Sequence, residues 1–389
     1  MPRLGTEQII VLLLLLAAPL RAETPSPLAR LKTVGREGAG NVAASRAWKE
    51  VVRMGPSALP AILAAMDDAD ATSANWLRTA VDAIAERTLA TGKPLPTEPL
   101  EQFVRQTRHA STARRLAYEW LCRVDPKTPD RLLPGMLQDP GPELRRDAVA
   151  AVIKEGQTRL DKNDKDGARA AYRKALTGAC DKDQVDVITK QLDKLGDKVD
   201  VAAHFGFVRQ WLLVAPFDNT KDAGFNIAYP PEKRVDPKAM YKGKKNAEAR
   251  WANHTTASPY GVVDLNKVLG KQKGVVAYAY AVIESPAERP VQIRAGSPNG
   301  IKIFLNGKEV FHVDEYHHGM EVDQYIAKAT LKSGRNELLL KVCQNEQKED
   351  WAQQWKFQVR LCDAVGAAVP YTPIAVKTVN PPKQEEGKP

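Results

Sequence analysis

The chain has 389 residues, of which 43% are hydrophobic and 27% are charged. This balance predicts packed domains and argues against bulk disorder, and the length allows two or three domains. The formal net charge of +10 favours an acidic partner, whether nucleic acid, acidic polysaccharide or anionic lipid.

The first 22 residues have the pattern of a secretory signal peptide. Arg3 supplies a positive charge, Ile9 to Ala18 form an apolar run, and Leu20-Arg21-Ala22 offers a cleavage site. The run is shorter than the roughly 20 residues of a membrane span, although an uncleaved anchor is the alternative. We therefore expect an exported protein, periplasmic or extracellular, with no transmembrane span after cleavage and no nucleic-acid partner.

Residues 28–200 are predicted to be helical, because Ala, Leu, Arg and Asp dominate and strand-like alternation is absent. Three similar segments recur there: RTAVDAI from Arg78, RLAYEWL from Arg115 and RDAVAAV from Arg146. This spacing is typical of helix pairs that bury their apolar faces by stacking. Residues 40–155 resemble HEAT repeats, which implies an α-solenoid that binds a protein partner. An irregular helical bundle is the alternative.

Residues 156–195 resemble a tetratricopeptide-type helix pair. The small and aromatic packing positions of this pair are Ala170, Ala171, Tyr172 and Ala175. Further upstream, Trp48, Trp76 and Trp120 lie at helical spacing among apolar residues, which favours core positions over a ligand platform.

The four cysteines, Cys122, Cys180, Cys343 and Cys362, form no Cys-x-x-Cys motif. This excludes zinc ribbons, thioredoxin-type centres and c-type haem attachment. Cys343 and Cys362 fall on consecutive predicted strands and, if these strands pair as a hairpin, lie about 20 Å apart. A disulfide requires Cα atoms within about 7 Å, so we expect free, buried thiols.

Composition changes near residue 203, and the predicted elements become strands. In the stretch IKIFLNGKEVFH (301–312), Asn306-Gly307 predicts a two-residue type I′ turn that pairs Ile303 with Val310 and Phe304 with Glu309. Short strands with turn signals predict a β-sandwich or jelly roll. Alternation in 355–361 predicts one packed and one solvent-exposed face. The remaining strands are expected at 211–217, 275–284, 291–294 and 336–342.

The segments FLNGK (304–308) and LKSGRNELLLKV (331–342) resemble the galactose-binding-like jelly roll of carbohydrate-binding modules. The resemblance covers residues 203–365. The opening segments of this range look like those of the sandwiches attached to exported bacterial proteins. It implies a β-sandwich that recognises a carbohydrate or cell-envelope glycan. It also implies a structural Ca²⁺ at the rim in some members, for which Asp218, Asn219 and Asp222 are the candidate ligands here.

Sugar sites need aromatic faces and polar side chains that bond hydroxyl groups. The candidate ligand-binding residues in the predicted loops are Trp251, Asn253, Tyr260, Tyr316, His317 and Trp351. For each of them, anchoring of its loop against the sandwich is the alternative.

A second cluster, His312, Asp314 and His317, contains residue types that bind zinc or another divalent metal. A metal-dependent enzyme that uses residues 312–318 is therefore one alternative function, and it requires these side chains to converge. No nucleophile elbow, phosphate-binding loop, dinucleotide fingerprint or HExxH motif occurs, so we expect that the protein is not an enzyme.

The run EKRVDPKAMYKGKKNAEAR (232–250) is strongly basic and is expected to form a long exposed loop. Such a loop is either simply solvated or able to steer an acidic glycan. Residues 366–389 are rich in Pro, Lys and Glu and are expected to form a disordered tail.

The sequence thus predicts an N-terminal α-solenoid of HEAT-like helix pairs, followed by an antiparallel β-sandwich of the galactose-binding-like jelly-roll type at 203–365. The predicted function is non-catalytic: the sandwich recognises a glycan and the helical repeats bind a protein partner. A purely structural protein-interaction module without a sugar site is the first alternative.

Overall fold

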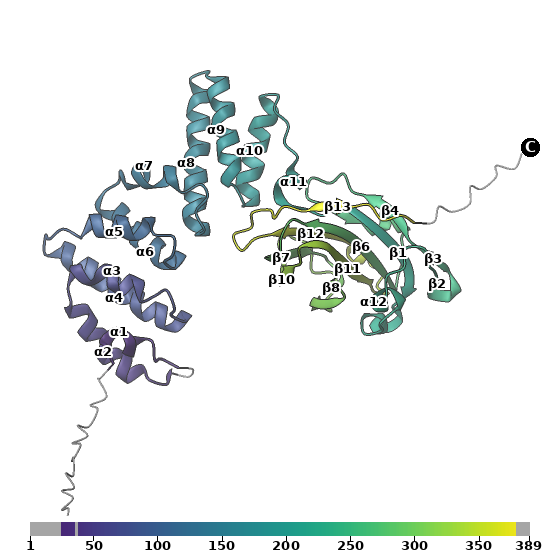
Figure 1. Cartoon of the computed structure of the whole chain (residues 1–389), viewed down its shortest axis with the longest axis horizontal. Coiled ribbons are helices and arrows are strands. Elements are labelled where there is room, and N and C mark those ends of the chain that lie inside the picture. The colour runs from purple at the N-terminus through teal and green to yellow at the C-terminus, as the bar shows by residue number, and fades with distance from the viewer. Residues whose placement is uncertain (1–24, 36–37, 379–389) are drawn as a thin grey trace, which may run out of the picture. The chain divides into compact units, whose positions relative to one another are not determined.

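The computed structural model describes residues 25–35 and 38–378, so the predicted signal peptide lies outside the described residues. The chain divides into two compact units, one ending at Thr128 and one starting at Pro129. Helices form the first unit, and helices followed by antiparallel sheets form the second (Figure 1). In the described ranges, no helix is both long enough and apolar enough to cross a membrane.

Helices in the first unit pack through small and aliphatic side chains. Trp120 is only 4% exposed and its indole N–H donates to Asp82 at 2.9 Å, which confirms its core position. Trp48 and Trp76 are half-buried. The helices are α1 (Pro27–Leu31), α2 (Asn41–Arg53), α3 (Leu59–Ala64), α4 (Ala71–Ala90), α5 (Thr97–Arg105) and α6 (Ser111–Val124), and α7 (Thr128–Leu132) crosses the boundary between the units.

The second unit begins with a group of helices that precede the sheets. Tyr172 of α9 is buried against Gly156 of α8, where an added Cβ would lie 2.9 Å from the phenol ring. Ala171 and Ala175 are buried as expected, whereas Ala170 is exposed because it lies on the outer side of α9. These helices are α8 (Pro142–Asp161), α9 (Lys165–Gly178), α10 (Lys182–Lys194) and α11 (Val201–Phe205).

Two antiparallel sheets make up most of the second unit. The large sheet has the order β4-β1-β6-β11-β8-β9, with β13 also paired to β6, and the small sheet has the order β10-β7-β12-β5. The large sheet contains β1 (Gln210–Asp218), β4 (Ala252–Thr255), β6 (Val275–Ser285), β8 (Gly300–Leu305), β9 (Lys308–Val313), β11 (Gly334–Gln344) and β13 (Thr372–Ile374). The small sheet contains β5 (Val263–Asp264), β7 (Arg289–Gly296), β10 (Tyr325–Leu331) and β12 (Lys356–Cys362), and a separate hairpin joins β2 (Met240–Lys242) to β3 (Glu248–Arg250).

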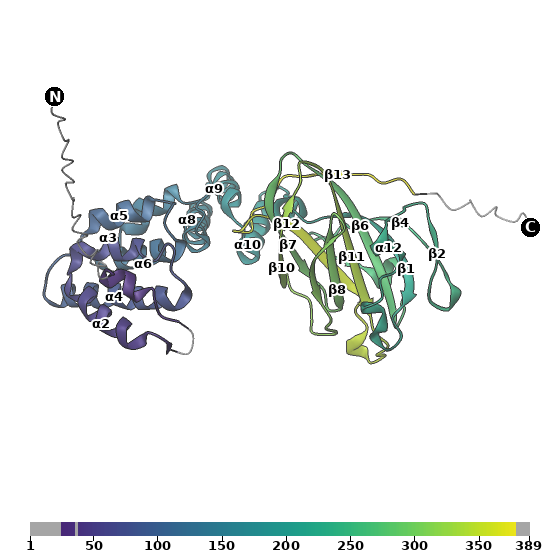
Figure 2. The ribbon, with the colours of Figure 1, turned by 60° about the horizontal axis from the view of Figure 1, so that its bottom comes forward.

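The two sheets lie face to face and enclose one apolar core (Figure 2). Ala279 of β6 and Leu340 of β11 meet Ile293 of β7 and Val359 of β12 in this core. Along each strand every second side chain points into this core, because successive side chains point to opposite faces of the sheet. Trp355, also in this core, is fully buried, as its predicted place on the apolar face of the last strand required.

The hairpin at 301–312 forms with the predicted turn. Asn306 and Gly307 have φ values of 52° and 79°, and Phe304 pairs with Glu309. Ile303, however, pairs with Phe311 rather than with Val310, because the register shifts next to Phe304. The extra residue makes a β-bulge in β9, a feature that the alternation of side chains does not reveal.

The prediction of a solvent-exposed face for residues 355–361 is wrong, and β6 is likewise buried on both faces. Val276, Tyr278 and Tyr280 of β6 are buried in a second apolar cluster on the outer face of the large sheet. On β12, Arg360 is 1% exposed and its Nε donates to Asp323 at 2.6 Å. Segments distant in the sequence cover both faces, so burial exceeds what the period of two predicts.

Cys343 and Cys362 are buried, unbridged thiols, as expected. The assumption of a hairpin behind that expectation is wrong, because β11 belongs to the large sheet and β12 to the small one. Residues 372–374, expected in the disordered tail, form β13 and pair with Val282–Glu284 of β6, just beyond the end of the β1 pairing. The rest of the tail from residue 379 lies outside the described residues.

A buried ion pair holds the segment between β1 and β2 against the outer face of the large sheet. The side chain of Lys341 on β11 is 0% exposed, and its ammonium group bonds Oε1 of Glu232 at 2.8 Å. The same group donates to the carbonyl oxygens of Phe225 at 3.0 Å and Ile227 at 2.8 Å. The Tyr278 hydroxyl also bonds Glu232, so the charged atoms are hydrogen-bonded as buried charges require.

We expect Glu232→Gln to lower the free energy of unfolding by roughly 3 kcal/mol, because it leaves the Lys341 ammonium buried without its counter-charge. Urea unfolding followed by tryptophan fluorescence measures this loss. The exposed neighbour provides the control: Lys233→Gln should change the free energy by less than about 0.5 kcal/mol. Equal stability of the Glu232→Gln and Lys233→Gln variants would contradict the structural role of the pair.

Candidate functional site

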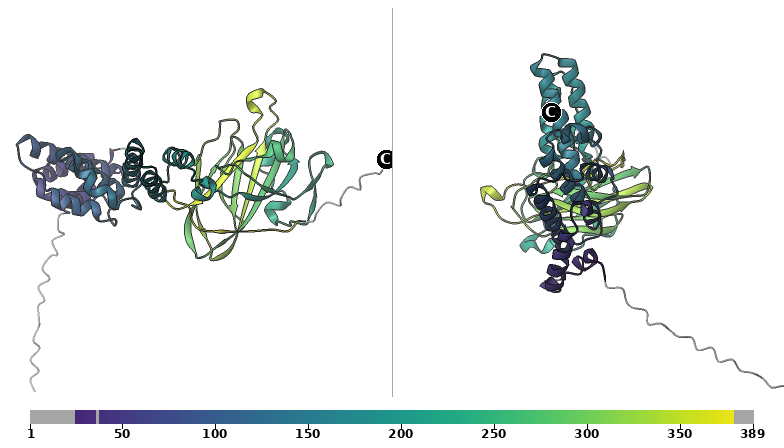
Figure 3. Two further views of the ribbon diagram at one scale, coloured as in Figure 1. Left: turned by 90° about the horizontal axis from the view of Figure 1, so that it is seen from above. Right: turned by 90° about the vertical axis from the view of Figure 1, so that its left-hand side faces the viewer.

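Polar residues from three loops meet at one end of the large sheet. β1 and β11 end there, and the connection from β9 to β10 passes over the same end. We call the residues gathered there the rim cluster, and they are Asn219, Asp222, Asp314, Tyr316, His317, Asn345, Glu346 and Trp351. The loop after β11, yellow-green in Figure 3, projects from this end of the sheets.

Asn219 joins the three loops to one another. It is 0% exposed, and its Nδ2 donates to the Tyr316 hydroxyl and to the carbonyl oxygen of Gln344, each at 3.2 Å. Its backbone N–H donates to Gly274 at 2.8 Å. Asn219 therefore ties the end of β1 to the loops that follow β9 and β11.

Trp351 belongs to the rim cluster and is 61% exposed. Its ring centroid lies 5.3 Å from that of His317, with an interplanar angle of 80°. His317 adopts a φ of 62°, and its Nε2 lies 2.8 Å from Oδ1 of Asn345. An exposed indole beside a fixed imidazole is a suitable surface for the apolar face of a sugar ring.

Buried amides hold the loop that carries Trp351. The Nδ2 of Asn299 donates to Oε1 of Gln344 at 3.1 Å and to the Gln354 carbonyl oxygen at 3.0 Å. Gln344 in turn donates to the carbonyl oxygen of Ala352 at 3.3 Å. Asn299 and Gln344 are both 0% exposed, so the base of the loop is fixed while its tip is open to solvent.

Carboxyl groups surround the aromatic pair. Although Asp222 and Asp314 keep much of their surface exposed, partial burial of the carboxyl group raises the pKa of each above 3.8. The negative charges of Asp314 and Glu346 raise the pKa of Asp222 further. Glu346 also accepts the backbone N–H of Lys221 at 3.0 Å. Exposed carboxylates of this kind are good acceptors for sugar hydroxyl groups.

Two buried polar atoms of the rim cluster have no hydrogen-bond partner among the described residues. They are Oδ1 of Asn219 and Nδ1 of His317. A buried polar atom without a partner costs free energy, so these two atoms are a local cost of the rim geometry.

Of the six predicted ligand-binding residues, Tyr316, His317 and Trp351 join the rim cluster, and the other three do not. Trp251 is 4% exposed and packs against Tyr280, at 6.2 Å between ring centroids. Asn253 is exposed on β4, where it bonds the Thr378 hydroxyl at 3.1 Å. Tyr260 faces the helices and bonds Asp186 of α10. The contacts of Trp251 and Tyr260 fit the alternative that these side chains anchor their loops.

The structure does not assemble the predicted metal ligands. His312 extends from β9 and its Nδ1 lies 2.7 Å from Glu309, whereas His317 points to Asn345. Across residues 25–35 and 38–378, no three His, Cys, Asp or Glu side chains are placed to hold a metal ion. Of the candidate Ca²⁺ ligands, Asp218 accepts from Thr220 and pairs with Lys244 at 3.3 Å, and Asn219 donates to the Tyr316 hydroxyl.

Sequence reasoning missed that Asn345 and Glu346 join the rim cluster, and it considered Asn219 and Asp222 only as calcium ligands. A signal was present, because polar residues follow the C-terminal ends of β1 and β11 directly. Strands β1 and β11 both run antiparallel to β6, so their C-terminal ends lie at the same edge of the sheet.

The comparisons with known proteins are distant. No family model matches the sequence, and no curated protein matches it. Among solved structures, a family 35 carbohydrate binding module from an environmental isolate is similar at 17% identity and a TM-score of 0.19, over 30% of this chain and 88% of that one. A beta-glucosidase from Kluyveromyces marxianus in complex with glucose is similar at 12% identity and a TM-score of 0.24, over 72% of this chain and 36% of that one. The chain thus spans about a third of the glucosidase.

We expect Asp222→Asn to raise the melting temperature at pH 7. The folded-state pKa of Asp222 is above the unfolded value, so the folded protein binds more protons and loses stability as the pH rises through that folded-state pKa. The amide removes this loss, and its advantage should shrink as the pH is lowered toward about 4. Scanning calorimetry across this range is the measurement.

The exposed residue Glu288, on a different loop, provides the matched control. Glu288→Gln removes the same charge and should leave the melting temperature unchanged. A lower melting temperature of Asp222→Asn at pH 7 would show that the carboxylate is stabilised by its surroundings, contrary to the raised pKa.

Proposed function

We propose that this chain is an exported, non-catalytic protein that binds a carbohydrate or cell-envelope glycan at the rim cluster. The observation that carries this proposal is Trp351, an indole 61% exposed on a loop whose base is fixed by buried amides. A fixed, exposed aromatic face loses little conformational entropy on binding and buries a large apolar area.

The surroundings of Trp351 support a sugar over a purely apolar ligand. Asp222, Asp314 and Glu346 are exposed and offer carboxylate acceptors. Sugar hydroxyl groups donate to acceptors of this kind, while the C–H-rich face of the ring covers the indole.

The proposal extends to the fold type and to the helices. The alternation of the chain between the two sheets supports a jelly roll of the galactose-binding-like type. The three similar segments lie in the long helices α4, α6 and α8, which supports HEAT-like helix pairs that bind a protein partner. Export follows from the apolar run near the N-terminus.

A structural module without a sugar site is the alternative, and it predicts that the rim cluster binds no glycan. The geometry of residues 312–318 does not support a metal-dependent enzyme, because His312 and His317 turn to separate partners.

We expect a glycan array probed with the whole chain to identify a ligand, and Trp351→Ala to weaken its binding at least tenfold, about 1.4 kcal/mol. Titration calorimetry with the selected glycan measures the loss. The loss arises because alanine removes the apolar face on which the sugar ring lies.

The exposed residue Ile326, which is 48% exposed on β10 of the small sheet, gives a matched control. Ile326→Ala should leave the affinity unchanged, and EDTA should leave it unchanged as well. An array without any selected glycan, or an equal loss from both substitutions, would count against the rim site and favour the structural alternative.

A further inference from the structure

A second recess lies on the outer face of the large sheet, away from the rim cluster. It has a volume of about 390 Å³ and lies between α12 (Pro230–Lys233) and the Asn306-Gly307 turn. Tyr280, Phe304 and Leu339 form its floor. We call this recess the face groove.

Side chains around the face groove are held in place by their own contacts. Asn306 donates to Oδ1 of Asn336 at 2.9 Å and accepts the N–H of Glu337 at 2.9 Å. Trp251 packs behind Tyr280 and its indole N–H donates to the Tyr241 hydroxyl at 3.3 Å. The groove is therefore formed before any ligand enters.

The charges that line the face groove do not cancel. Glu232 is turned to the buried Lys341, and Glu337 accepts from Arg335 at 3.1 Å. Lys233 and Arg234 also line the groove and are exposed, and no ion pair to another described residue occupies either of them. Two positive charges are left over beside an aromatic floor.

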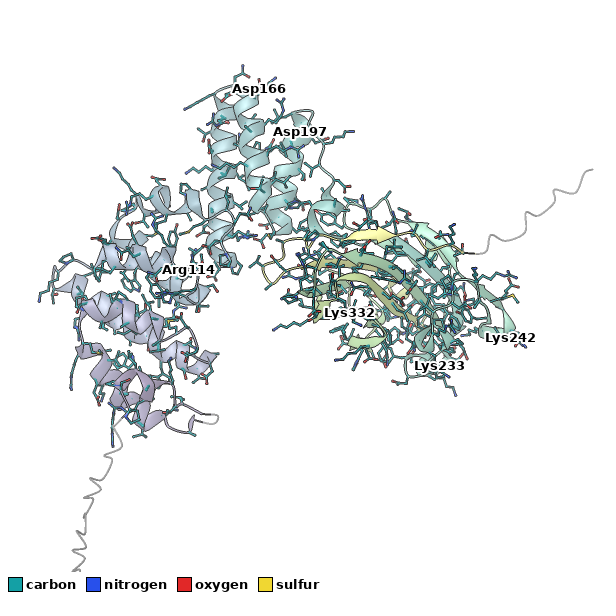
Figure 4. The ribbon with its side chains drawn as sticks, viewed as in Figure 1. Arg114, Asp166, Asp197, Lys233, Lys242 and Lys332 are labelled. Carbon is teal, nitrogen blue, oxygen red and sulfur yellow. The ribbon has the colours of Figure 1, made fainter. Side chains whose placement is uncertain are left out.

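Basic residues continue along the sequence beyond the groove, in the segment that leads into and forms the β2–β3 hairpin, which we call the basic arm (residues 236–250). Lys238, Lys242 and Lys245 are exposed there, whereas Glu248 is paired with Arg250. Figure 4 shows the labelled side chains of Lys233 and Lys242 at the periphery of the sheets. A ligand that meets both the groove and the basic arm must be extended and negatively charged at several points.

We propose that the face groove and the basic arm bind an anionic polysaccharide, with one acidic sugar in the recess and its charge beside Lys233 and Arg234. The following sugars lie along the lysines of the basic arm. This site rests on the proposed function, since it makes the glycan acidic, but it uses residues separate from the rim cluster.

A polysaccharide fits the face groove better than a lipid surface does. The apolar side chains under the recess are almost fully buried, with Tyr280 3% and Phe304 8% exposed, so they offer no apolar surface that could insert into a bilayer. Met240, which is 57% exposed, is the large apolar side chain that projects from the basic arm, and Arg250 contacts its sulfur at 3.1 Å. A sugar ring enters the recess and places its carboxylate or sulfate at the positively charged wall.

Polygalacturonate and the matched pair of dextran sulfate and neutral dextran are the probes for this site. We expect the whole chain to bind both acidic polymers at least tenfold more tightly than dextran at 50 mM NaCl, measured by biolayer interferometry. Affinity should fall steeply at 300 mM NaCl, because screening weakens exposed charges. The double substitution Lys233→Gln with Arg234→Gln should reduce binding of both acidic polymers at least tenfold.

The control removes the same two charges from another exposed surface. Lys190→Gln with Lys194→Gln on α10 should change the affinity by less than twofold. Equal losses from the two double variants would overturn the proposal, because binding would then follow net charge alone. Unchanged binding of the acidic polymers by the Lys233 and Arg234 variant would also overturn the proposal. Binding of phosphatidylserine vesicles or single-stranded DNA in place of the acidic polymers would overturn it as well.

The two sites fail separately in this design. Loss of acidic-polymer binding by the Lys233 and Arg234 variant supports the face groove. If Trp351→Ala at the same time leaves binding of the array-selected glycan unchanged, that result counts against the rim cluster as a sugar site. Loss from Trp351→Ala alone supports the rim cluster and overturns the face groove.

Discussion

The buried ammonium group of Lys341 fixes the loops on which the rest of the sheet unit depends. It lies on the outer face of a central strand, where solvent would otherwise reach the sheet, and it is bonded to Glu232 and to two backbone carbonyl oxygens. Removal of either charge would leave the other unpaired in an apolar cluster, which is costly. The segment from residue 219 to residue 234 is therefore held against the sheet and cannot move away from it cheaply.

This segment contributes to both candidate sites. Its start supplies Asn219 and Asp222 to the rim cluster, and its end supplies Lys233 and Arg234 to the face groove. The Lys341 contacts lie between these two ends in the sequence. One anchor can thus preorganise an acidic, aromatic rim and a basic, aromatic groove on the same sheet, and preorganised sites lose less free energy to ordering when a ligand binds.

Local patterns in the sequence predicted the elements that depend on local chemistry. The Asn306-Gly307 turn, the Phe304–Glu309 pair and the buried apolar face of β12 all follow from neighbouring residues. Burial of Arg360 did not, because two of the groups that cover it, Phe205 and Asp323, are far away in the sequence. The burial of Trp251 and the exposure of Trp351 could not be predicted from local sequence either, since an indole suits both a core and a binding surface. Only the packed structure distinguishes the two residues.

The predicted metal cluster shows the same limit. His312 and His317 are close in sequence, but β9 extends through His312 while His317 lies in the following loop, so their side chains turn to Glu309 and Asn345. Proximity along the chain is informative inside a regular element and loses its meaning where an element ends.

Hydrogen–deuterium exchange on the whole chain, with and without the glycan selected on the array, tests the central claim most directly. The account predicts slower exchange in peptides that cover 219–224, 314–318 and 345–352, with unchanged exchange in α8 to α10. Protection confined to the helices, or none at the three rim loops, would contradict it.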